Sequence, residues 1–145
     1  MKVLVSAASK HGGTAGIAEA IARRLAEAGH DVVVVEPNEA EHVDRFDAFV
    51  LGSGVYAGHW LEQGKDLVHE VGRHAHGRPV WLFSSGPRGS PAVPDHDAVD
   101  VRHLVDSVAA RDHHLFSGRL DMSVLGFAER AVRRGAAAAR QRHAR

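Results

Sequence analysis

Short apolar runs and amphipathic stretches alternate along this chain. A continuous apolar run bounded by small or polar residues is typical of a strand buried on both faces of a parallel sheet. Five stretches have this pattern and predict strands: Val3 to Val5, Asp31 to Val35, Phe46 to Leu51, Pro79 to Ser84 and His114 to Ser117.

The stretch from Thr14 to Ala28 has the period of a helix. Ile17, Ile21 and Leu25 recur every four residues, and charged residues take the other face, so this stretch predicts an amphipathic helix that ends at Gly29. Similar patterns predict helices at 61–71 and 100–110, with a short helix at 39–45.

This alternation predicts the fold class. A helix that follows each strand returns the chain to the same edge of the sheet, so the pattern indicates an α/β fold, a doubly wound five-stranded parallel sheet with helices on both faces. The 145 residues, 44% of them hydrophobic, have room for one ordinary core. We therefore interpret residues 1–145 as a single domain.

The composition excludes several classes of function. Lysine and arginine total 18, as do aspartate and glutamate, so no global attraction to nucleic acid is expected. The absence of cysteine excludes disulfides, cysteine nucleophiles and thiolate metal sites. No apolar run is long enough for a signal peptide or a membrane span, and a cytoplasmic location is expected.

The candidate chemistry lies where strands end. In doubly wound sheets the ligand binds beyond the carboxyl ends of the strands, at the point where the strand order reverses. Three predicted loops lie there: residues 6–14, 52–60 and 84–90. The proline- and glycine-rich stretch 87–97 could be a lid or an ordinary loop.

The first loop has the character of a phosphate site. Gly12 and Gly13 allow successive N–H groups to converge, Ser9 and Thr14 add hydroxyls, and the helix that follows points its positive end at the loop, with Lys10 at its rim. The alternative is a glycine-rich turn that binds nothing. The Gly-Lys-Ser/Thr signature of a P-loop is absent, and the GxGxxG-like match at 52–57 follows the third strand rather than the first.

These loops resemble those of a known family. Ser9-x-x-Gly12-x-Thr14 is similar to the phosphate loop of flavodoxins, and residues 46–53 look like their third strand. The run Tyr56-Ala57-Gly58-His59-Trp60 resembles the flavin-contacting loop of the menaquinone-dependent protoporphyrinogen oxidases. The resemblance covers residues 1–90 and, more loosely, 91–128.

The resemblance implies strand order 2-1-3-4-5 and flavin mononucleotide (FMN) as the cofactor. His11 stands where flavodoxins usually carry a hydroxyl, and the protoporphyrinogen oxidase branch also lacks that hydroxyl. The residues implied at the cofactor are Ser9, Lys10, His11, Gly12, Gly13 and Thr14 for the phosphate, and Ser53, Gly54, Val55, Tyr56, Ala57, Gly58, Trp60, Ser84, Ser85 and Gly86 for the isoalloxazine.

Three side chains near the implied flavin have alternative interpretations. Tyr56 or Trp60 could supply an aromatic face to the flavin, or could pack in the core. His59 could exchange a proton with the flavin or stabilise its reduced form as a catalytic residue, or could be an uninvolved surface histidine. The other paired histidines, such as His113 and His114, lack carboxylate or cysteine partners at ligand spacing, so no metal site is expected.

Two redox functions and one non-redox function follow from the resemblance. The first is an oxidoreductase that oxidises a small molecule of the protoporphyrinogen type and passes electrons to a quinone, in heme biosynthesis. The balanced charge favours it, because carrier flavodoxins are strongly acidic. The second is an electron carrier between redox proteins, and the third is a flavin-free module that acts through protein contacts.

The C-terminal segment 119–145 is atypical and basic. Leu125, Phe127 and Ala131 lie on one apolar face with arginines at its edge, so residues 121–135 could contact a membrane surface or pack as an ordinary helix. No further periodic segment follows Gly135, as the usual final helix would. We therefore expect that 121–142 folds back over the sheet or that a second copy, in a homodimer, covers it.

Overall fold

The computed structural model describes residues 1–10, 12–75, 77–86, 100–116, 124 and 126–133. The strands are β1 (Lys2–Ala8), β2 (Asp31–Val35), β3 (Ala48–Tyr56), β4 (His59–Trp60), β5 (Val80–Ser85) and β6 (Asp112–Phe116). The helices are α1 (Gly13–Glu27), α2 (Glu62–His74) and α3 (Val101–Val108). Two short 3-10 helices, Pro37–Glu39 and Val43–Arg45, stand where a short helix over 39–45 is predicted.

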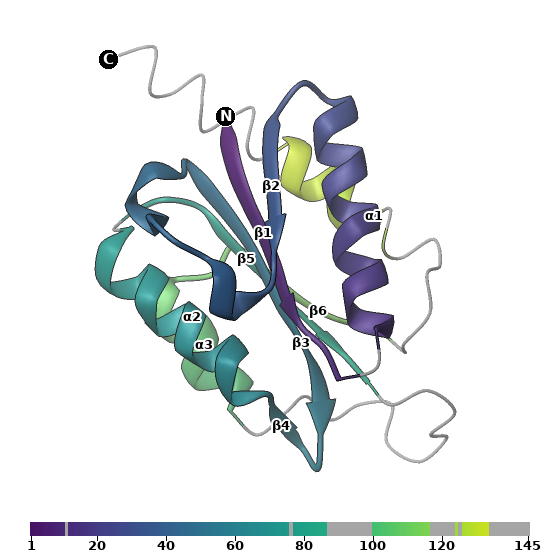
Figure 1. Cartoon of the computed structure of the whole chain (residues 1–145), viewed down its shortest axis with the longest axis vertical. Helices are drawn as coiled ribbons and strands as arrows, with labels where there is room; N and C mark the ends of the chain where they lie inside the picture. Colours follow the sequence, from purple (N-terminus) through teal and green to yellow (C-terminus); the bar gives the residue numbers. More distant parts are fainter. Residues whose placement is uncertain (11, 76, 87–99, 117–123, 125, 134–145) are drawn as a thin grey trace.

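The predicted sheet order is confirmed. The strands lie in the order β2-β1-β3-β5-β6 and all of these pairs are parallel, which is the predicted order 2-1-3-4-5 once the two-residue β4 is set aside. β4 pairs antiparallel with β3. The order reverses at β1, because the chain runs outward to β2 and then returns to place β3 on the other side of β1 (Figure 1).

Alternating residues of the strands supply two cores, one on each face of the sheet. Val3, Val5 and Val50 lie in a cluster with α1, whereas Leu4 and Leu51 lie in a cluster with α2 and α3. Figure 1 shows α1 on one side of the sheet and the α2–α3 pair on the other. The result is a three-layer α/β/α domain in which the central strands are buried on both faces.

The C-terminal helix (residues 124 and 126–133) packs on the sheet beside α1 (Figure 1). Phe127 and Ala131 are at most 2% exposed, and Phe127 lies edge to face against Phe83 and Phe116. Arg24 of α1 pairs with Glu129. Residues 124 and 126–133 therefore cover this face of the sheet, which agrees with the first of the two expectations for the C-terminal segment; the other residues of 121–142 lie outside the described ranges.

The same packing favours an ordinary packed helix over a membrane contact. The apolar face of the C-terminal helix is occupied by the core, so it is not free to enter a lipid surface. Arg130 at its edge pairs with Asp112 of β6 at 2.9 Å. None of the described helices is long and apolar enough to cross a membrane. Residues of the same chain therefore cover the face of the sheet that a second copy was expected to cover as the alternative.

The third strand is longer than its apolar run predicts. It extends to Tyr56, through residues that the sequence suggests are loop. A Cβ on Gly52 would collide with the ring of Phe83, so this glycine admits a neighbouring aromatic side chain rather than forming a turn. The extension carries residues 52–56 to the carboxyl edge of the sheet.

Candidate functional site

The predicted loops meet at the carboxyl edge of the sheet. Ala8, the last residue of β1, pairs with Ser53, and Gly54 pairs with Ser85. This register brings the ends of β1, β3 and β5 to one level beside the point where the strand order reverses. His11 and the predicted loop 87–97 fall outside the described residues.

The β1–α1 loop presents backbone amides to open space. Gly12 is the N-cap of α1 with φ +85°, a left-handed conformation that favours glycine. The first helical hydrogen bond runs from Gly16 N to the Gly12 carbonyl, so the amides of Gly13, Thr14 and Ala15 precede it. A Cβ on Gly12 or Gly13 would meet nothing within 4 Å, and both glycines are exposed.

Two amides of this loop already donate to oxygen atoms. Gly12 N donates to Ser9 Oγ at 2.9 Å, and Lys10 N donates to the Tyr56 hydroxyl at 3.2 Å. The Ser9 hydroxyl thus shapes the loop by accepting one of its own amides. The amides of Gly12 and Lys10 are thus engaged within the protein, and the phosphate site in this loop stays a prediction.

Tyr56 folds over the loop from the end of β3. The Lys10 ammonium lies 4.8 Å from the centre of the Tyr56 ring. A Cβ on Gly54 would lie 2.8 Å from Tyr56 Cε2 and 3.1 Å from Thr14 Oγ1, so Gly54 lets the ring and the start of α1 approach each other. Three predicted site residues from three segments, Lys10, Thr14 and Tyr56, are therefore brought together.

Residues 56–60 form a tight hairpin rather than an open loop. Tyr56 pairs with His59 and Val55 with Trp60 across a two-residue turn. Both turn residues have positive φ, 51° at Ala57 and 81° at Gly58, which is the pattern of a type I′ hairpin. Gly58 suits this turn, whereas the Cβ of Ala57 makes the same conformation costly.

Trp60 belongs to the core, so the core-packing interpretation holds for this residue. Its side chain is buried, and its indole Nε1 donates to Ser84 Oγ at 2.8 Å. Ser84 Oγ also lies 2.9 Å from His113 Nε2. Of the two aromatic residues predicted to face the flavin, only Tyr56 remains partly accessible.

Ser53 and Gly86 bond backbone groups at this edge, whereas Ser84 bonds the side chains of Trp60 and His113. Ser53 is fully buried, accepts from Leu61 N at 3.0 Å and donates to the Gly54 carbonyl at 2.8 Å. The Gly86 amide donates to the Phe116 carbonyl at 2.8 Å. The Ser53 and Ser84 hydroxyls and the Gly86 amide are therefore engaged within the protein.

His59 lies at the exposed side of the hairpin, with 56% of its side chain accessible. Its Nδ1 is 3.7 Å from Asp100 Oδ2, and Lys65 Nζ is 3.3 Å from the same oxygen. The hydrogen bond that Lys65 donates to the Glu62 carboxylate, together with the neighbouring Asp100 carboxylate, raises the pKa of Lys65 against a smaller opposing effect of burial. Sequence reasoning missed Asp100, Lys65 and the pairing of His113 with Ser84, because no motif marks them.

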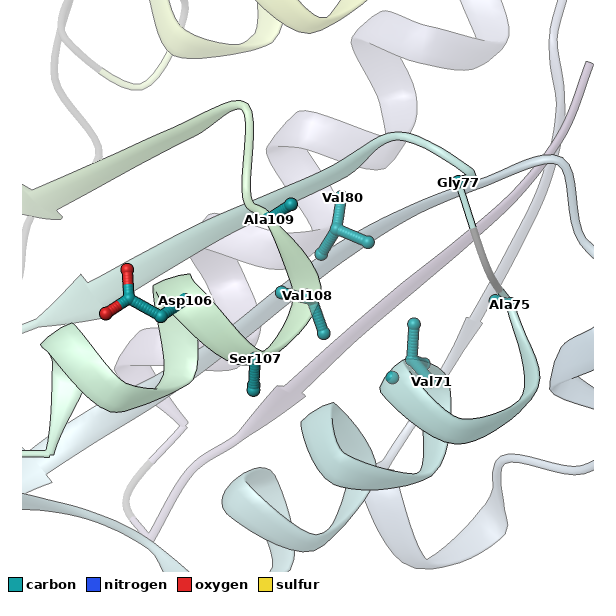
Figure 2. Close-up of a pocket in the computed structure, with 9 residues that line it drawn as sticks. Val71, Ala75, Gly77, Val80, Asp106, Ser107, Val108 and Ala109 are labelled. Atoms are coloured by element: carbon teal, nitrogen blue, oxygen red, sulfur yellow. The ribbon is translucent and has the colours of Figure 1, made fainter.

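A pocket lies at the opposite end of the sheet. Figure 2 shows it between the C-terminal ends of α2 and α3 and the beginning of β5, with Val71, Val80 and Val108 in its wall and Asp106 beside them. It is remote from the three loops and has none of their residues. Within the described ranges, no group of three or more histidine, aspartate or glutamate side chains could hold a metal ion.

Comparisons with known proteins place the chain in a family. A family model described as a flavodoxin domain matches residues 4–136. No curated protein matches the sequence significantly. Among solved structures, a flavodoxin from Streptococcus pneumonia is similar at 18% identity and TM-score 0.74, covering 94% of this chain and 99% of that one.

Two further structures show the same fold. A two-electron reduced flavodoxin from Megasphaera elsdenii is similar at 20% identity and TM-score 0.74, covering 92% of this chain and 99% of that chain. A flavodiiron core from Synechocystis is similar at 18% identity and TM-score 0.72, covering 93% of this chain but 36% of that one. The structural likeness gives the fold, and the sequence model gives the family: this chain belongs to the flavodoxin domain family.

Proposed function

We propose that this chain is a redox flavoprotein that binds FMN at the carboxyl edge of its sheet, with the phosphate in the β1–α1 loop. The observation that supports this most strongly is the group of backbone amides that precede the first helical hydrogen bond of α1. They lie at the point where the strand order reverses, and there is open space beside Gly12 and Gly13. Flavodoxin domains bind FMN, and this chain is a member of that family.

The residues of the loop suit a phosphate group. A phosphate needs several hydrogen-bond donors, and Gly13, Thr14 and Ala15 offer amides at the positive end of a 15-residue helix. Each charge–dipole contact contributes about 0.3–1 kcal/mol when exposed and ~2 kcal/mol when partly buried. The Lys10 ammonium adds a positive charge at the rim.

The isoalloxazine would lie between the hairpin and the end of β5. Tyr56 offers an aromatic face, and the backbone of residues 54–58 is close to the phosphate loop. When bound, FMN supplies the one- and two-electron chemistry, while the chain binds, orients and shields it. His59, exposed at the hairpin, is placed to exchange protons with solvent.

For the reaction, we propose the two-electron oxidation of a small molecule of the protoporphyrinogen type, with electrons passed to a quinone. Two features support this: the run from Tyr56 to Trp60, and the equal numbers of acidic and basic residues, 18 of each. An electron carrier is the second candidate, supported by the flavodoxins that match this chain over nearly their whole length.

FMN binding is tested by titrating the purified protein with FMN and with riboflavin. We expect yellow protein and much tighter binding of FMN, because riboflavin lacks the phosphate. Gly13→Val should weaken FMN binding and leave riboflavin binding unchanged. Gly16→Val is the matched control, since Gly16 also has open space around it but lies inside α1. A colourless protein that takes up neither flavin would support the flavin-free module instead.

The choice between enzyme and carrier is tested with the FMN-loaded protein. Reduction of menaquinone on addition of protoporphyrinogen would support the enzyme. Reduction only by a flavodoxin reductase, with no turnover of protoporphyrinogen, would support the carrier. His59→Gln should change the turnover or its pH profile if His59 exchanges protons during the reaction.

A further inference from the structure

Asp100 precedes α3 but does not cap it. Aspartate is a favoured N-cap residue because its carboxylate accepts from the first amides of a helix. Here Asp100 has helical backbone angles, φ −95° and ψ −3°, and its side chain makes no capping hydrogen bond. Its carboxylate instead faces the β3–β4 hairpin and α2.

The carboxylate contacts three groups on two other elements. Oδ1 accepts from the backbone amide of Trp60 at 3.5 Å. Oδ2 lies 3.3 Å from Lys65 Nζ of α2 and 3.7 Å from His59 Nδ1 of β4. The Asp100 side chain is 18% exposed, and Oδ2 is buried without a directional hydrogen bond, so its neighbours are the Lys65 ammonium and the His59 ring.

The hairpin that Asp100 contacts needs such support. β4 has only two residues, and its turn places Ala57 in a left-handed conformation. A conformation of this kind persists only where the surrounding structure holds it. The indole of Trp60 on Ser84 fixes one end of the hairpin. Asp100 contacts the backbone of the same strand and lies beside the His59 ring.

We propose that Asp100 is a positioning residue that locks the Tyr56–Trp60 hairpin in the conformation that receives the flavin. This rests on the proposed function, because the hairpin is the segment assigned to the isoalloxazine. Lys65 holds the carboxylate in place from α2, and the carboxylate in turn holds Trp60 and His59. The loss of Asp100 would loosen the hairpin without removing any group assigned to the FMN phosphate.

The test compares Asp100→Asn with the wild-type protein in two measurements. Hydrogen exchange followed by NMR should show faster exchange of the hairpin amides, by about tenfold at Trp60, since its charged acceptor is lost. Titration should show FMN binding weakened by about the same factor. Lys65→Met should reproduce part of both effects, and it supplies the readout if Asp100→Asn fails to fold.

Asp106→Asn is the matched control, because it makes the same change on the same helix at the end remote from the hairpin. Equal exchange rates at Trp60 in the Asp100 and Asp106 variants would overturn the proposal, as would a double variant of Asp100 and Lys65 whose effects simply add. If the wild-type protein binds no FMN, the proposed function fails. Faster hairpin exchange in the free Asp100 variant would then still support its role in holding the hairpin.

Discussion

The β1–α1 loop and the β3–β4 hairpin lie at the same edge of the sheet but are built differently. The loop has two adjacent glycines at the start of α1, and a Cβ on either Gly12 or Gly13 would have no atom within 4 Å of it. The hairpin is tied by hydrogen bonds to side chains: Trp60 to Ser84, Leu61 N to Ser53, and Trp60 N to Asp100. The two segments meet where the Tyr56 hydroxyl accepts from Lys10 N.

This difference suits the two parts of the proposed ligand. A phosphate accepts hydrogen bonds from several equivalent donors, so the backbone amides of a loop can bind it. The side chains of such a loop need only leave space for the ligand. A flat ring needs a surface at a fixed position, so the hairpin must be rigid. Changes to the hairpin should therefore cost stability, whereas changes to the loop should mainly cost phosphate binding.

We expect the largest loss of stability from Trp60→Ala, a change in the hairpin. Truncation of a buried aromatic residue costs about 3–5 kcal/mol of the free energy of unfolding. The change also removes the donor to Ser84 Oγ. Urea denaturation of wild-type protein, Trp60→Ala and Trp60→Phe measures it, with the phenylalanine variant losing less because it keeps a ring. A loss below ~1 kcal/mol in Trp60→Ala would show that the hairpin is not anchored by this side chain.

Ser53→Ala should cost less than Trp60→Ala. It leaves the partly buried amide of Leu61 without its acceptor, which costs about 1 kcal/mol, the lower end of the range for an unsatisfied donor. Ser107→Ala is a matched control, because the Ser107 hydroxyl donates to a helical carbonyl, that of Leu104. Thermal and urea denaturation should separate the two serines. Equal stability of both variants would contradict a structural role for the Ser53 hydroxyl.

Gly12→Ala tests the loop. A residue with a Cβ at φ +85° costs about 1–2 kcal/mol. Gly13→Ala has no such constraint, so its stability should change by less than about 0.5 kcal/mol. Isothermal titration should nevertheless show weaker FMN binding in both variants. Unchanged FMN binding by Gly13→Ala would indicate that the phosphate lies elsewhere.

Much of the fold could be predicted because it depends on local periodicity. β2 matches its predicted range, Asp31–Val35, and α1 is within one residue of its predicted range at each end. The packing of the C-terminal helix is harder to predict. Its apolar face indicates that the helix packs against a partner, but the sequence does not show which residues form that partner. Its cover includes Phe83 and Phe116, which are distant in the sequence.

The site was only partly predictable, for a related reason. The glycines of the first loop mark backbone geometry, which is local, so Gly12 and Gly13 could be recognised from the sequence alone. Gly52 was predicted to lie in a loop, but it is a residue of β3 whose lack of a side chain leaves room for the ring of Phe83 on neighbouring β5. The contacts of Asp100 depend entirely on how α3 packs against α2 and the hairpin, and no spacing in the sequence indicates them.

The smallest effect, and one of opposite sign, is expected from Ala57→Asn. Ala57 has φ 51° at the first position of the hairpin turn, where asparagine followed by glycine is strongly preferred. The change should raise the free energy of unfolding by about 0.5–1 kcal/mol, since asparagine tolerates the left-handed region better than alanine. Ala28→Asn is the control, because Ala28 is also exposed but has φ −82°. If Ala57→Asn raises the free energy of unfolding and Ala28→Asn does not, the turn carries backbone strain, which the side-chain contacts of the hairpin hold in place. If neither variant is more stable, the turn is not strained.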